Sequence, residues 1–137
     1  MTHLSRLTVA LCAVAEHRGL SAELMTYQGK IAVVEGFAHE LAHQLEAGRN
    51  FEIRIRTSCD PDANEHEAST LRIEIAALAA LGVRVSLRRL WRESNWRSER
   101  PPLTKVRRTP SDRERRCVKA FVRIVEHAMA QTRSVET

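Results

Sequence analysis

The stretch FAHELAHQL contains two histidines and a glutamate whose spacing suits metal-assisted hydrolysis. His39, Glu40 and His43 form the pattern H-E-x-x-H. Residues four apart on an α-helix lie on the same face, so the imidazoles of His39 and His43 can bind one ion. Glu40 lies about 100° round the helix from His39, where its carboxylate can take a proton from a water molecule at that ion. The pattern predicts a zinc site with a general base; its alternative is a core helix with two incidental histidines.

A catalytic zinc site also needs a third protein ligand, because three ligands leave the fourth position open for water or substrate. The candidates lie downstream in EHEASTLRIEIAALAALG, residues 65–82, which is predicted to be a helix. Glu67 and Glu74 are seven residues apart and share a face of that helix, whereas His66 points elsewhere. Reasoning from the residues alone leaves all three open as the third ligand. Tyr27, Arg72 and His66 are candidates for stabilising the negative charge that develops during hydrolysis.

Helices are predicted for most of the chain around these residues. The apolar spacing indicates helices over residues 3–18, 36–47, 65–82 and 111–131. Gly48 and Gly82 end the second and third, as glycine often does at a helix C-terminus. Ser111 and Glu114 form a capping box at the start of the fourth. These predictions place both parts of the candidate site on helices.

Three segments are interpreted as strands that complete a small sheet. Residues 51–57 and 83–91 alternate apolar and polar side chains, as half-buried strands do. Residues 30–34 are β-branched and apolar, and form either a short strand or the first turns of a helix that runs to Glu46. We therefore expect an α+β fold, mainly helical with a small sheet. Residues 1–98 would form its domain, residues 99–110 a Pro/Arg-rich linker, and residues 111–137 a basic amphipathic helix and tail.

Positive charge is concentrated in the C-terminal half. Residues 1–70 contain 6 Lys+Arg and 10 Asp+Glu, a net charge of −4, and residues 71–137 contain 16 and 7, a net charge of +9. Arginine forks bind phosphates and indole rings can stack on bases, so this half can bind a nucleic acid. The alternative is a solvated arm anchored by Trp91 and Trp96. The candidate contacts to nucleic acid are Arg88, Arg89, Arg92, Arg107, Arg108, Arg113, Arg115 and Arg116.

Composition limits the remaining classes. With 43% hydrophobic and 28% charged residues, the sequence is globular in composition. The three cysteines lie far apart without a C-x-x-C pair, so neither a disulfide framework nor a thiolate zinc site is indicated. No segment approaches the ~20 apolar residues of a membrane span. We therefore expect a cytoplasmic protein without a membrane partner.

The two helical segments together resemble a known group of enzymes. FAHELAHQL, followed by HEASTLRIEIAALAALGV, is similar to the small zincin metallopeptidases of the ImmA/IrrE and ArdC-like families. The resemblance covers about residues 30–83 and implies a zincin-like fold and a Zn²⁺ cofactor. It implies that His39 and His43 are zinc ligands, that Glu40 is the general base, and that Glu67 is the third ligand with Glu74 in reserve.

Two functions follow as expectations. The first is a zinc-dependent metallopeptidase that hydrolyses a peptide bond in a protein substrate, which the basic half would bring to DNA-associated proteins. The alternative is a small basic nucleic-acid-binding or regulatory protein of a mobile element, in which H-E-x-x-H is incidental or non-catalytic. Zinc content and the effect of replacing Glu40 distinguish the two.

Overall fold

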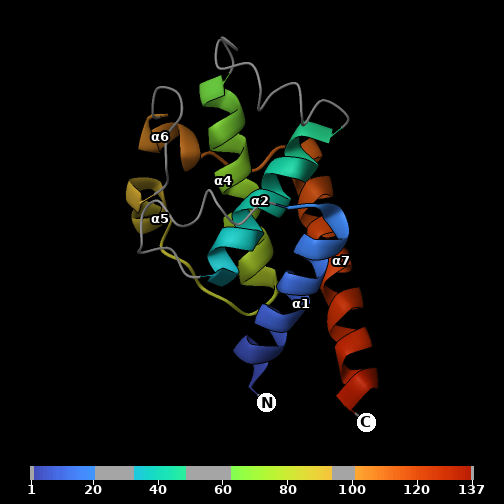
Figure 1. Cartoon of the computed structure of the whole chain (residues 1–137). Helices are drawn as coiled ribbons and strands as arrows, with labels where there is room; N and C mark the ends of the chain where they lie inside the picture. The colour runs from blue at the N-terminus through green and yellow to red at the C-terminus, as the bar shows by residue number, and fades with distance from the viewer. Residues whose placement is uncertain (1, 21–32, 49–62, 94–100, 137) are drawn as a thin grey trace.

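The protein is described by a computed structural model that covers residues 2–20, 33–48, 63–93 and 101–136. The longer helices in these ranges are α1 (His3–Arg18), α2 (Val33–Ala47), α4 (Ala63–Ala80) and α7 (Asp112–Glu136). Two short helices, α5 (Leu87–Glu93) and α6 (Leu103–Val106), lie beside α4 (Figure 1). No strand occurs within these four ranges. The expected α+β class is therefore wrong, and the described fold is all-helical.

The helix ends follow from local residue types. Thr2 caps α1 because its hydroxyl oxygen accepts the Ser5 backbone N–H at 3.1 Å, and Gly19 ends the helix with a left-handed φ of 66°. The predicted capping box of α7 is confirmed. The Glu114 N–H donates to Ser111 Oγ at 3.1 Å, and the Ser111 N–H donates to Glu114 Oε1 at 2.8 Å. Short-range capping thus sets these helix ends.

The strand prediction fails where it can be tested. Residues 83–86 run without regular structure and residues 87–93 form α5, so 83–91 is not a strand. The alternation had a different cause: Val83 and Val85 pack on the main core, while Val85 and Leu87 pack on a second cluster. Val83, Val85 and Leu87 therefore face inward at every second position, as in a strand, but they pack against helices and not within a sheet. Of residues 30–34, Val33 and Val34 belong to α2; residues 30–32 and the predicted strand 51–57 lie outside the described ranges.

One hydrophobic core joins the four long helices. Its buried residues include Leu11 of α1, Leu41 of α2, Ile73 of α4, and Phe121 and Val125 of α7. The C-terminal helix, which follows the proposed linker, thus packs in the same core as the helices of the site. A second cluster holds α5 and α6 against α4; it consists of Ala68, Leu71, Leu90 and Val106. None of the described helices has the length and apolar character needed to cross a membrane.

Candidate metal centre

The candidate site lies between α2 and α4, which pack against each other (Figure 1). His39 and His43 lie one turn apart on α2, with ring centroids 4.4 Å apart and ring planes at 88°. This is the shared face that the H-E-x-x-H spacing predicts for a helix. Glu67 faces them from α4, and its Oε2 lies 3.7 Å from His43 Nε2. The structure thus brings Glu67 to two histidines that precede it by 24 and 28 residues in the chain.

The donor atoms of these three residues fit a metal ion. One ligand atom from each of His39, His43 and Glu67 lies within 4.8 Å of the other two. Such atoms need to close in by only about an ångström to surround an ion bound at about 2.0–2.2 Å. The three side chains are 14%, 23% and 21% exposed, respectively, so the cluster is accessible from solvent. Two imidazoles, one carboxylate and an open side are the donor set of a catalytic zinc site.

Glu74 forms a hydrogen bond with the Nδ1 atom of His39. Its Oε1 lies 2.6 Å from His39 Nδ1, and its carboxylate is fully buried. Burial of the ring lowers the pKa of His39, but the charge and hydrogen bond of Glu74, together with the charges of Glu67 and Glu40, outweigh burial and raise that pKa to about 9. A Nδ1–H that donates to a carboxylate leaves Nε2 as the nitrogen for a metal. Glu74, the reserve third ligand, therefore takes the position of a residue that supports a ligand.

Thr70 plays the same part for His43 over a longer distance. Thr70 Oγ1 lies 3.4 Å from His43 Nδ1 and donates its own proton to the His66 carbonyl oxygen at 2.8 Å. Because that proton is committed, the hydroxyl oxygen can act towards His43 only as an acceptor. An Nδ1–H on His43 then leaves its Nε2, the nitrogen nearer Glu67, for a metal. Both histidines are thus contacted at Nδ1 from α4, which leaves the Nε2 of each ring for a metal.

Glu40, the predicted general base, is buried with 2% of its surface exposed. It follows His39 on α2, and its charge contributes to the raised pKa of that ring. Its carboxylate therefore lies within electrostatic reach of the cluster without being one of the three converging ligands.

The other candidates around the site are engaged elsewhere. His66 Nδ1 lies 3.2 Å from Glu46 Oε1, so its ring is drawn towards α2 outside the three-residue cluster. Glu46 is buried and is approached from α7 by Arg113, whose Nη1 lies 3.5 Å from the same oxygen. The guanidinium of Arg72 forms a bidentate pair with Glu114. Tyr27 lies outside the described residues.

The eight arginines proposed for nucleic-acid binding come from three elements. Arg88, Arg89 and Arg92 lie on α5, Arg107 and Arg108 follow α6, and the other three lie in the first turns of α7. Seven of them are exposed and Arg89 is half-buried. Two already have acidic neighbours: Arg113 contacts Glu46, and Arg115 pairs with Asp112. The seven exposed arginines therefore place positive charge on α5, after α6 and at the start of α7.

Two supporting residues escaped the sequence analysis, Thr70 and Glu46. Thr70 carries a usable signal, because it lies three residues after Glu67 and four before Glu74, on the same face of α4. Glu46 gives no comparable signal, since its partners His66 and Arg113 come from two other helices. Comparison with protein-family models, curated proteins and solved structures finds no match to this chain.

Proposed function

We propose that the protein is a zinc-dependent metallopeptidase with its active site between α2 and α4. The observation that carries the proposal is the convergence of His39, His43 and Glu67, with one donor atom from each within 4.8 Å of the other two. The buried carboxylate of Glu40 on the same helix adds the base that hydrolysis requires. Glu74 and Thr70 add the supporting acceptors that metal-binding histidines need.

The residues divide the chemistry among themselves. A zinc ion at this position would polarise a water molecule and the scissile carbonyl group. Glu40 would accept the proton of the attacking water and return it to the leaving amine. Because Glu40 is buried, its carboxylate does not have to be taken out of bulk water when a substrate covers the site. The hydrogen bond to Glu74 would keep His39 in one orientation throughout.

Two variants separate metal binding from catalysis. Glu40→Gln should retain about one zinc per chain and lose ~10²-fold or more of the cleavage rate on fluorescently labelled casein, because the amide cannot accept the proton. His43→Ala should lose both zinc and cleavage. Glu16→Gln, which changes an exposed carboxylate on α1, is the matched control and should keep both. Wild-type protein without zinc, or Glu40→Gln with undiminished cleavage, would contradict the proposal.

A nucleic acid is the proposed second partner. Arg107, Arg108 and Arg116 are exposed, and their guanidinium groups form no ion pair within the described residues. They would bring the peptidase to protein substrates that are bound to DNA. Binding of a single-stranded oligonucleotide should weaken steeply with salt and fall further in the triple glutamine variant, while zinc content stays unchanged. Equal binding by that variant would remove these arginines from the interface.

A further inference from the structure

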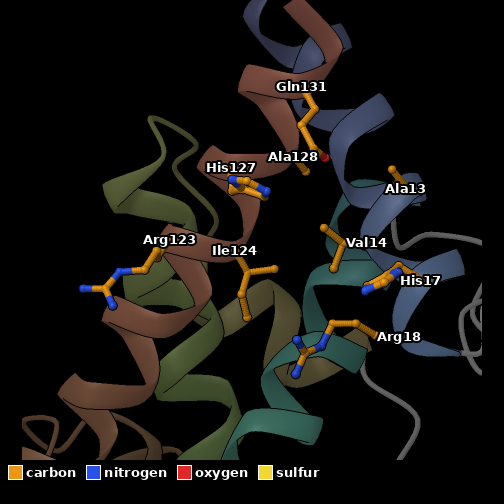
Figure 2. A pocket seen from close by; sticks show the side chains of 9 residues that line it. All are labelled: Ala13, Val14, His17, Arg18, Arg123, Ile124, His127, Ala128 and Gln131. Carbon is orange, nitrogen blue, oxygen red and sulfur yellow. The ribbon is translucent and has the colours of Figure 1, made fainter. Parts of the chain in front are cut away.

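A groove of about 610 Å³ runs between α1 and α7, away from the metal centre (Figure 2). Val14 and Ala128 are buried along its floor, and Ile124 is partly buried beside them. None of the three converging ligands His39, His43 and Glu67 lines it. The lining residues are Ala13, Val14, His17, Arg18, Arg123, Ile124, His127, Ala128 and Gln131. The volume lies within the range of pockets that bind small molecules.

The polar side chains of the groove are all basic or neutral. His17 and Arg18 come from α1, and Arg123 and His127 from α7. Figure 2 shows the Arg18 guanidinium reaching below Val14 and Ile124, whereas the Arg123 side chain points away from α1. No carboxylate is among the lining residues. The acids next in sequence to these residues, Glu16 and Glu126, are exposed and do not line the groove.

The cationic groups also have capacity for a ligand. Arg18 donates its Nε–H to Gln44 Oε1 at 2.6 Å. This hydrogen bond holds the guanidinium at Nε and leaves its two terminal nitrogens, Nη1 and Nη2, for another acceptor. Within the described ranges, Arg123 makes no ion pair with a carboxylate. Guanidinium forks bind carboxylate and phosphate groups bidentately. An anion placed here would therefore meet donors that the fold itself has not used.

We propose that this groove binds an amphipathic anion, a small molecule with an apolar body and one carboxylate or phosphate head. The body would cover Val14, Ile124 and Ala128, and the head would lie at the terminal nitrogens of Arg18. Charge complementarity selects this class, because a cationic or doubly polar ligand would lose hydration on the floor or face like charges at the rim. The site is independent of the metal centre and does not require peptidase activity.

Four ten-carbon probes test the ligand class by isothermal titration calorimetry on the wild-type chain. Decanoate and decyl phosphate should bind, and the tighter of the two identifies the preferred head. Decanol and decyltrimethylammonium should bind at least ~10-fold more weakly, since each good charge-assisted pair is worth at least that factor. Equal binding of decanol would show that apolar contact alone is sensed, and no binding of either anion would exclude the site; both results overturn the proposal.

Variants test where the anion binds. Arg18→Gln should weaken decanoate binding ~10-fold or more, and Ala13→Trp should obstruct the groove from an exposed position that leaves the core intact. Arg116→Gln removes an exposed arginine of α7 that does not line the groove, and is the control. An equal loss in Arg116→Gln, or unchanged binding in both groove variants, would place the anion elsewhere. Circular dichroism on each variant checks that the helices are retained.

Discussion

The affinity of the metal centre for zinc should rise steeply with pH because of one residue. In the metal-free protein, burial disfavours the charged ring of His39, but the neighbouring carboxylates, Glu74 first, raise its pKa to about 9. Below that pH the ring carries a proton on both nitrogens. Zinc must therefore displace the Nε2 proton, and the cost of removing that proton subtracts from the binding free energy.

The size of this effect follows from the pKa. Between pH 6.5 and pH 8.5, release of a proton from a group with a pKa of about 9 strengthens binding about 80-fold, or roughly 2.6 kcal/mol. A histidine with the ordinary pKa of 6.5 would give only about a twofold change over the same range. The difference between these two numbers is large enough to measure with a zinc-chelating dye whose own protonation is corrected for.

Glu74→Gln is the control for this prediction. The amide keeps the size and an acceptor oxygen of the buried carboxylate but removes its charge, so the pKa of His39 should fall and the pH dependence should flatten. At pH 8.5 the variant should bind zinc about 10- to 100-fold more weakly, the usual cost of losing such a supporting group. A wild-type affinity that stays nearly constant with pH, or an identical slope in Glu74→Gln, would refute the assigned role of the His39–Glu74 pair.

Three further predictions concern Thr70, the Arg72–Glu114 pair and Gly19. Thr70→Val should weaken zinc binding about tenfold through the lost acceptor to His43, whereas Thr70→Ser should restore it; equal affinities of the two variants would refute that role. Arg72→Met should lower the free energy of unfolding by about 3–5 kcal/mol, because it leaves the buried Glu114 carboxylate without its bidentate partner; a loss below about 1 kcal/mol in urea unfolding would contradict this. Burial raises the pKa of Glu114, but Arg72 and the other hydrogen-bond donors outweigh it and lower that pKa to about 2, so the stabilisation is present above pH 4.5 and is lost as the pH falls towards 2. Gly19→Ala should cost about 1–2 kcal/mol, since Gly19 has a φ of 66°, and an unchanged melting temperature would exclude strain at that position.

The helices could be predicted because their signals are local. The capping box at Ser111 and Glu114 involves residues three apart, and Gly48 and Gly82 mark helix ends through positive φ values of 59° and 87°. The sheet could not be excluded in the same way. Alternation in VRVSL reports which side chains face inward, and an extended segment packed on helices alternates as a strand does. Only the position of a hydrogen-bonding neighbour distinguishes the two, and that is tertiary information.

The convergence of the three candidate ligands was predictable, and the residues that contact them only partly. His39 and His43 follow from spacing within one helix, and Glu67 from the resemblance of the paired segments. The contact between Glu46 and Arg113 joins residues 67 positions apart in the chain and depends on how α7 packs beside α2. No periodicity within one helix encodes such a contact, so that part of the site required the structure.

The spacing of Glu67 and Glu74 assigns them different roles. Seven residues of α-helix place the two on one face but about 10.5 Å apart along its axis, too far for both to bind one ion at about 2.0–2.2 Å. His39 and His43 are separated by only about 6 Å along α2. Glu67 lies 3.7 Å from Nε2 of His43. Glu74 instead lies 2.6 Å from Nδ1 of His39, on the other edge of that ring. We therefore expect the two glutamates to have different roles: Glu67→Ala should abolish zinc binding, whereas Glu74→Gln should only weaken it, and equal losses in metal titration would contradict this division.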